Sequence, residues 1–515
     1  MRPIMMPVGP PALRRILLLI LAMGSIPFVG LSADGKSLIA GIAKVEITQP
    51  DHDAGDNPPF VRALVISDPA SEVSAVLVAV DAVAIAEIGA IRDPYLENVR
   101  RSLKAELGID PKSVVINASH CHALVCDDVE AKTIEAVRAA WENRVAVLVA
   151  AGTSHEDRIS VNRRLKLKNG READERHAYA MPPDEEIAAV GPIDPEIGLL
   201  RLDRIDTGKP LALVFHFSCH PIQGVPSGGN TADLSGFAAK TIEEQLGDGV
   251  VAMFLQGCGG DINPVLYKAV DRPRDARPLG TQLGLSALRG ARDLKAEAGA
   301  ALKVSNEILS VPRAKLDGRI AELEREITAL TAQLKGTSLN FDTFLPLMVK
   351  YGLSGETPSA DAKRYLQDEV LGSEDWKHLD EENRKNLDAY LRNIHVMEDL
   401  TRKQVNLALL EKHEARRIAA GSDSIEVEVA GLRVGDFRLV TFPGELTVPI
   451  GLGLKQRSPH DLTFISGYTN GYLYYAPTAD QLLNRGGAQE DSDCLLAPEW
   501  QAIFEAKALE ILKSL

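Results

Sequence analysis

The sequence predicts an α/β (α+β) fold, in which a mixed-sheet domain is interrupted by an inserted helical hairpin. Short β-branched runs alternate with helical stretches from residue 38 to about 310, which is typical of sheets with helices packed on them. A helical region over 312–418 breaks this alternation, and strand-like runs return after it. We therefore expect one domain in two sequence segments, 34–311 and 419–515.

The first 33 residues have the layout of a secretory signal peptide. Arg14 and Arg15 precede an apolar run at 16–21, and small residues follow as far as Ala33, where we expect cleavage. A membrane anchor is the alternative, but the run is shorter than the roughly 20 apolar residues that span a bilayer. We expect an exported protein, secreted or periplasmic, with no stable membrane span.

The first segment of the domain contains most of the predicted elements. Strands are expected at 63–66, 75–80, 113–116, 158–161, 211–217 and 250–255, and helices at 94–107, 231–247 and 280–297. This order of elements favours mixed rather than purely parallel sheets.

The predicted insertion consists of two helical stretches. Leucines and isoleucines from Leu316 to Leu334 alternate at spacings of four and three, with charged residues between them. A comparable pattern covers 381–420, and a looser segment at 338–373 lies between the two. We expect an antiparallel hairpin that serves as a structural or partner-binding arm.

The second segment returns to strands. Runs at 425–429 and 437–442 are strand-like, a tyrosine-rich stretch follows at 468–475, and 499–515 has the pattern of an amphipathic helix.

Charge and cysteine content exclude some classes of protein. The net charge of −15 argues against binding to nucleic acid or to anionic membrane surfaces. Five cysteines are too few, and odd in number, for a disulfide framework. We expect small buried thiols, although a Cys121–Cys126 link is possible in an oxidising compartment.

Residue types that bind zinc occur at or near the ends of predicted strands. They are His120 and His122, then His220, Glu445 and Tyr475. On an extended strand His120 and His122 would project to the same side, where both could face one metal. Taken alone, each of these residues is more often a hydrogen-bonded or packing residue than a metal ligand. Because no local metal motif is present, a zinc site could only be assembled by the fold.

A glycine-rich stretch at 256–264 follows the strand predicted at 250–255. Its glycines permit close backbone approach, and their amides could bind an oxyanion. The alternative is a tight turn capped by Asp261. Cys258 could act as a nucleophile only beside a base, and sequence alone does not reveal which side chains lie next to it.

Taken together, these segments resemble the neutral ceramidase family, secreted zinc-dependent amidases that hydrolyse ceramide. Ser-His-Cys-His at 119–122 is similar to the Thr-His-Thr-His of that family. The other matching pieces follow in the same order along the chain, at 40–48, 161–163, 220–221, 231–236, 260–264, 443–445 and 470–475.

The resemblance implies roles for particular residues. The zinc ligands would be His120, His220, Glu445 and Tyr475. His122 and Arg163 would face the reacting group of the substrate, and Asn263 stands where the family has its active-site serine.

The resemblance implies an exported hydrolase that uses Zn²⁺ and an activated water to cleave an N-acyl amide in a ceramide-like lipid or other acylated small molecule. Asn263, and the lack within these 515 residues of the immunoglobulin-like domain of ceramidases, motivate a second hypothesis. In that hypothesis the zinc hydrolase acts on another ester, lactone or amide. A third hypothesis is a non-catalytic envelope protein that binds a protein partner through the hairpin.

Overall fold

A computed structural model describes residues 37–53, 55–174, 182, 184–224, 230–247, 249–269, 271–353, 369–483 and 488–515. The predicted signal peptide lies outside these residues. Within them, no helix has both the length and the apolar character needed to cross a membrane.

The main sheet has eight strands in the order β12-β11-β10-β5-β1-β2-β3-β4. Its edge pairs β11–β12 and β3–β4 are parallel, and the other pairs are antiparallel. The predicted mixed α/β class is therefore confirmed. The strands are β1 (Ile39–Glu46), β2 (Phe60–Asp68), β3 (Val73–Val80), β4 (Val114–Ala118), β5 (Val145–His155), β10 (Glu196–Arg204), β11 (Pro210–Phe217) and β12 (Val251–Gln256).

A second sheet packs on one face of the first. It consists of β14 (Leu302–Pro312), β15 (Ser424–Val434), β16 (Phe437–Thr441) and β18 (Thr463–Ser466). Because side chains alternate along a strand, Leu64 of β2 joins the core between the two sheets, whereas Ala63 and Val65 face the opposite side. Phe437 and Phe464 from the second sheet stack at 4.7 Å in the same inter-sheet core.

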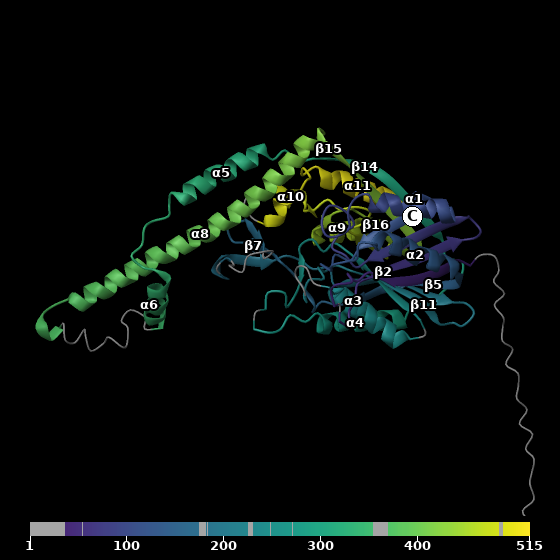
Figure 1. Cartoon of the computed structure of the whole chain (residues 1–515), viewed down its shortest axis with the longest axis horizontal. Helices are drawn as coiled ribbons and strands as arrows, with labels where there is room; N and C mark the ends of the chain where they lie inside the picture. The colour runs from purple at the N-terminus through teal and green to yellow at the C-terminus, as the bar shows by residue number, and fades with distance from the viewer. Residues whose placement is uncertain are drawn as a thin grey trace, which may run out of the picture.

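Helices cover the outer faces of the two sheets (Figure 1). Those beside the main sheet are α1 (Tyr95–Leu107), α2 (Val129–Glu142), α3 (Asp233–Leu246) and α4 (Arg277–Arg292). Helix α11 (Trp500–Ser514) packs on the second sheet, where Trp500 and Phe504 contact the ring of Phe442. The amphipathic helix predicted at 499–515 is thereby confirmed.

The main sheet curls until its edge strands β4 and β12 approach each other. Asn117 joins them, because its Oδ1 accepts a hydrogen bond from the backbone N–H of Gln256 at 2.9 Å. Its Nδ2 donates to the carbonyl of Gly467 and to the hydroxyl of Thr469, both at 2.9 Å. One buried amide thus connects three segments that are far apart in the sequence.

The inserted helices lie between β14 and β15, whose ladder closes with the pair Pro312↔Ser424. Helix α5 (Asp317–Thr331) packs along α8 (Asp375–Ala420), which projects from the body of the protein (Figure 1). With 46 residues α8 is about 69 Å long at 1.5 Å per residue. The division into domains and the binding of a protein partner remain predictions.

Several expected boundaries are wrong. The strand expected at 158–161 is β6 (Ser160–Asn162), which pairs with the short β13 (Ile262–Pro264) instead of joining the main sheet. The helix expected to reach residue 297 ends at Arg292. The segment expected to be loose contains α6 (Phe341–Leu353), which packs Phe344 and Tyr351 against α8.

We predict that Gly198→Ala lowers the free energy of unfolding by about 1–3 kcal/mol through overpacking. A Cβ at Gly198 would lie 2.4 Å from the ring of Phe464, so the alanine would force the two sheets apart. Gly318→Ala on α5 is the matched control, because a Cβ at Gly318 would have no atom within 4 Å. Denaturant unfolding of both variants is the measurement, and equal stability would contradict the prediction.

Candidate metal centre

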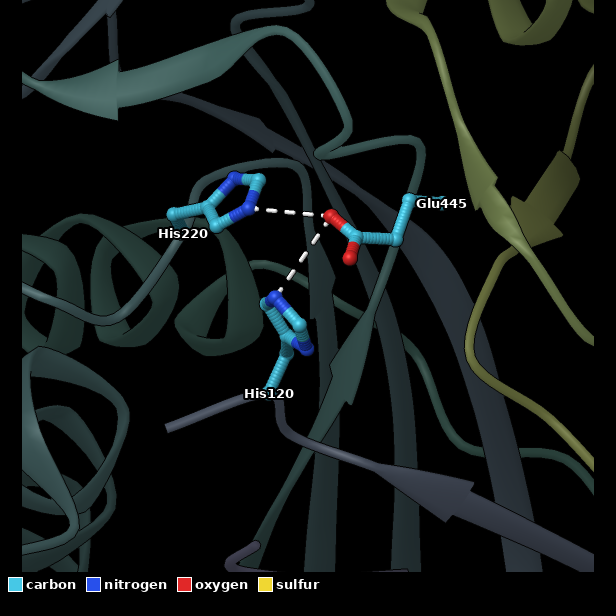
Figure 2. A group of neighbouring side chains, drawn as sticks. All are labelled: His120, His220 and Glu445. Atoms are coloured by element: carbon cyan, nitrogen blue, oxygen red, sulfur yellow. Dashed lines mark hydrogen bonds and ion pairs between the residues drawn. The ribbon is translucent and has the colours of Figure 1, made fainter. Parts of the chain in front are cut away.

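Two histidines and a glutamate meet inside the protein. The ligand atoms of His120, His220 and Glu445 all lie within 4.8 Å of one another, the one such group found among the described residues. Oε2 of Glu445 lies 3.1 Å from Nε2 of His220 and 3.5 Å from Nε2 of His120 (Figure 2). All three side chains are buried.

Each member of this triad follows the carboxyl end of a strand. His120 stands two residues after β4, His220 three residues after β11, and Glu445 opens β17 (Glu445–Leu446) shortly after β16. The curl of the main sheet and its contact with the second sheet bring these ends together. Three segments without a local metal motif thus form one site.

The expectation that His120 and His122 share one face of an extended strand is wrong. Strand β4 ends at Ala118, and His120 has a positive φ of 66°. Its backbone N–H donates instead to the carbonyl of Ala82 at 2.9 Å. The two rings still lie near each other, with centroids 5.3 Å apart, and His122 is only half-buried.

Backbone carbonyls fix which ring nitrogen of each histidine faces Glu445. Nδ1 of His120 donates to the carbonyl of Val83 at 2.6 Å, and Nδ1 of His220 donates to that of Ile262 at 3.1 Å. A carbonyl only accepts, so each Nδ1 carries the proton and each neutral ring presents a lone pair on Nε2.

Burial keeps both rings in this neutral state. It lowers the pKa of His120 to about 4 and also lowers the pKa of His220, although the charge of Glu445 opposes both shifts. Two imidazole lone pairs and a carboxylate oxygen therefore converge without a proton between them. This donor set fits a bound cation, since metals bind neutral imidazole and ionised carboxylate.

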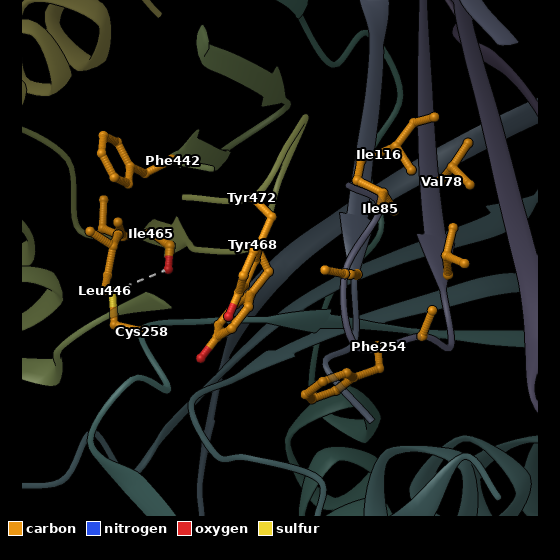
Figure 3. Close-up of a cluster of buried hydrophobic side chains, with 14 of the residues drawn as sticks. Val78, Ile85, Ile116, Phe254, Cys258, Phe442, Leu446, Ile465, Tyr468 and Tyr472 are labelled. Atoms are coloured by element: carbon orange, nitrogen blue, oxygen red, sulfur yellow. Dashed lines mark hydrogen bonds between the residues drawn. The ribbon is translucent and has the colours of Figure 1, made fainter. Parts of the chain in front are cut away.

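Tyr468 and Tyr472 support Glu445. The hydroxyl of Tyr468 donates to Oε2 at 3.2 Å, and that of Tyr472 donates to Oε1. Both tyrosines belong to the buried cluster drawn in Figure 3. Burial raises the pKa of Glu445, but His120, His220 and the Tyr472 hydrogen bond outweigh it and hold the pKa below its usual range.

The tyrosine cluster is visible in the sequence, but the family resemblance implies a role only for its last member, Tyr475. Tyr475 pairs with Glu445 where β17 runs parallel to β19 (Tyr475–Ala476). Its hydroxyl lies 3.0 Å from Nη2 of Arg163. The metal-ligand role of Tyr475 remains a proposal.

Arg163 and Asn263 lie together beside Tyr475. Arg163 donates from Nη1 to Oδ1 of Asn263 at 3.1 Å and from Nη2 to the carbonyl of Gly260 at 2.7 Å. Nδ2 of Asn263 is buried and has no hydrogen-bond partner. The glycine-rich loop thus contributes a backbone carbonyl that orients the arginine.

Three further buried acids, Asp81, Asp233 and Asp261, bind groups other than the triad. Asp81 pairs with Arg62 at 2.5 Å, Asp233 accepts from the backbone of residues 223 and 224, and Asp261 accepts from the backbone N–H of Val448. Asp233 and Asp261 thus bind backbone N–H groups, as turn-forming and capping residues do, whereas Asp81 forms a buried ion pair.

The cysteines are free and buried, so the Cys121–Cys126 link is wrong. Burial raises the pKa of the Cys258 thiol far above its usual range, and the thiol contacts the carbonyl of Ile465 at 3.6 Å (Figure 3). Cys258 is thus packed as a small apolar residue.

The base of the helical arm braces the loop behind the triad. On α8, the ring of His413 packs at 4.8 Å from Tyr474, and its Nε2 lies 2.8 Å from Oδ1 of Asp493. The carbonyl of Tyr474 accepts the backbone N–H of Glu445 at 2.9 Å. The arm therefore supports the position of a triad residue through one intervening tyrosine.

We predict that His220→Ala lowers zinc affinity by more than the roughly 100-fold typical of losing an outer-shell contact, because it removes a ligand atom. His216→Ala is the control, since His216 is buried in the core and its Nε2 lies 3.0 Å from the carbonyl of Ile465. Calorimetric zinc titration should show a loss only in the first variant. Equal affinities in the two variants would contradict the assignment.

We further predict that Tyr472→Phe lowers zinc affinity about 10–100-fold, because Glu445 loses a buried hydroxyl donor. Tyr474→Phe provides a neighbouring control, since its hydroxyl contacts Glu87 at 3.4 Å. The same titration checks both variants, and an unchanged affinity in Tyr472→Phe would show that the hydroxyl does not act on the site.

The fold of this chain is similar to that of solved protein structures. No protein-family model matches the chain, and no curated protein matches it in sequence. The crystal structure of neutral ceramidase from Pseudomonas aeruginosa superposes with a TM-score of 0.57 at 15% identity, over 93% of this chain and 75% of that one. A ceramidase complexed with C2 gives 0.56 at 15% identity, over 92% and 75%. The chain therefore has a neutral ceramidase-like fold, as its sequence resemblance predicts.

Proposed function

We propose that the protein is an exported zinc-dependent hydrolase that cleaves an N-acyl amide bond in a ceramide-like substrate. The convergence of His120, His220 and Glu445 carries this proposal, and the ceramidase-like fold supports it. Export rests on the composition of residues 1–33. Recovery of the protein only from the cytoplasm, with its N-terminus intact, would contradict export.

His120, His220 and Glu445, with Tyr475 as the proposed fourth ligand, would hold the metal. When bound, zinc polarises a carbonyl and lowers the pKa of a water to about 7. Burial lowers the pKa of Arg163, but Tyr475 and Glu490 outweigh it and hold the pKa well above the usual value. Arg163 thus stays cationic and can stabilise negative charge that develops on the substrate oxygen.

His122 and Asn263 complete the proposed chemistry. The half-buried ring of His122 beside His120 can pass a proton to the leaving amine. The unpaired Nδ2 of Asn263 can donate to a substrate oxygen.

Asn263 also favours a second candidate function. Where the resemblance implies a serine, an amide side chain can donate a hydrogen bond but cannot act as a nucleophile. A substrate whose oxygen needs an extra donor, such as another amide, an ester or a lactone, would suit this site. The two candidate functions use the same metal site and differ in the acyl compound that is cleaved.

We predict that zinc-loaded protein releases fatty acid from a short-chain ceramide and that His120→Ala abolishes this release, because the variant lacks a proposed metal ligand. Chromatographic measurement of the fatty acid, with unfolding curves to show that the variant is folded, provides the test.

A panel of esters, lactones and short N-acyl amides extends this experiment. Cleavage of a panel member without cleavage of ceramide would favour the second candidate. A zinc-loaded protein that cleaves nothing in the panel would remove the basis for a hydrolase and favour a binding function.

A further inference from the structure

Glu490 is a fully buried carboxylate between two consecutive arginines. Its Oε1 accepts a hydrogen bond from Nε of Arg163 at 2.6 Å, and its Oε2 accepts one from Nη2 of Arg164 at 3.0 Å. The side chain is 0% exposed. A buried carboxylate requires such partners, and each arginine in turn needs an anion nearby.

The rest of the Arg163 guanidinium faces the candidate metal centre. Nη2 contacts the hydroxyl of Tyr475 at 3.0 Å, and Nη1 donates to Asn263 at 3.1 Å. Glu490 therefore binds the Nε edge of the Arg163 guanidinium. The Nη atoms of the same planar group contact Tyr475 and Asn263. Rotation of the plane would move every one of these contacts.

The position of Glu490 is itself fixed by its surroundings. It lies in the 3₁₀ turn η4 (Gln489–Asp491), whose backbone N–H groups at 489 and 490 donate to Oδ2 of Asp174 at 2.6 and 3.2 Å. Asp491 binds Arg164 at 2.7 Å and Glu172 binds it at 2.9 Å. The Glu490 carboxylate is thus held in two ways. The backbone of its turn binds Asp174, and its partner Arg164 is itself bound by Asp491 and Glu172.

We propose that Glu490 is a positioning residue for Arg163. It sets the plane of the guanidinium toward the reacting oxygen and balances a buried positive charge beside the metal ligands. This inference rests on the proposed hydrolase function and assigns Glu490 a role in that reaction.

The test compares Glu490→Gln with Asp491→Asn. Both changes replace a carboxyl group by an amide in the same turn, but of these two residues only Glu490 contacts Arg163. We expect Glu490→Gln to lower kcat by about 10–100-fold with little change in KM, because a misplaced group loses transition-state contacts. Asp491→Asn should lower kcat by much less than Glu490→Gln does, because Asp491 reaches Arg163 only through Arg164, which keeps its other acidic partner Glu172. Equal kcat in Glu490→Gln and the unaltered protein would overturn the proposal.

A double variant separates positioning from a general structural effect. If Glu490 acts through Arg163, Arg163→Lys combined with Glu490→Gln should be no slower than Arg163→Lys alone. If the decrease in kcat of the double variant equals the product of the two single decreases, Glu490 acts independently of Arg163, and the proposal fails. Should Glu490→Gln not fold, Glu490→Asp replaces it and should show an intermediate kcat, because it keeps the charge at a shorter reach.

A measurement without turnover completes the test. An acyl hydroxamate, which places an anionic oxygen beside a metal, should bind zinc-loaded Glu490→Gln about tenfold or more weakly by calorimetry, because the Arg163 contact is misaligned. The zinc content should equal that of the unaltered protein. An active unaltered protein with no effect of Glu490→Gln on either readout refutes this inference alone. An unaltered, zinc-loaded protein that neither reacts nor binds the hydroxamate refutes the proposed function, and the inference with it.

Discussion

The main constraint on this structure is that two imidazole rings and one carboxylate point their lone pairs at the same buried space, with no proton shared between them. Two neutral imidazoles and a carboxylate lie within 4.8 Å of one another in a buried space, where polar groups are costly unless they are bonded. The carbonyls of Val83 and Ile262 bind the histidine protons, and Tyr468 and Tyr472 bind the carboxylate. The two carbonyls thus bind the histidine rings at Nδ1, away from Glu445, and the two tyrosine hydroxyls bind both oxygens of the carboxylate.

Holding these groups in place depends on the closure of the main sheet. Asn117 joins β4, β12 and the tyrosine segment through one amide, so the strand ends that carry His120 and His220 meet near Tyr468. A hydrocarbon side chain could fill this position but could not satisfy three backbone and side-chain groups at once. The metal centre and the curvature of the sheet are therefore parts of one arrangement.

Charge is balanced over a wider region than the triad. Arg163, Glu490 and Arg164 form a buried chain of alternating charges, and Asp491 and Glu172 end it at the less buried side. Breaking such a buried pair leaves one charge without a partner, which destabilises a protein more than the pair itself stabilises it. The helical arm adds a further contact, because His413 packs on Tyr474, whose carbonyl accepts the backbone N–H of Glu445.

The sequence by itself determined the fold class and part of the order of elements, because periodicity and β-branched runs are local properties. It did not predict strands β5, β10 and β14. It also indicated His120, His220 and Glu445, which the structure brings together, since each follows a strand-like run and matches an ordered family pattern. Only the tertiary structure decided the rest. The positive φ of His120, the helix α6 and the roles of Tyr468, Tyr472 and Glu490 all depend on partners far away in the chain. Such contacts leave no local pattern, because a buried hydroxyl or carboxylate looks the same in sequence wherever its partner lies.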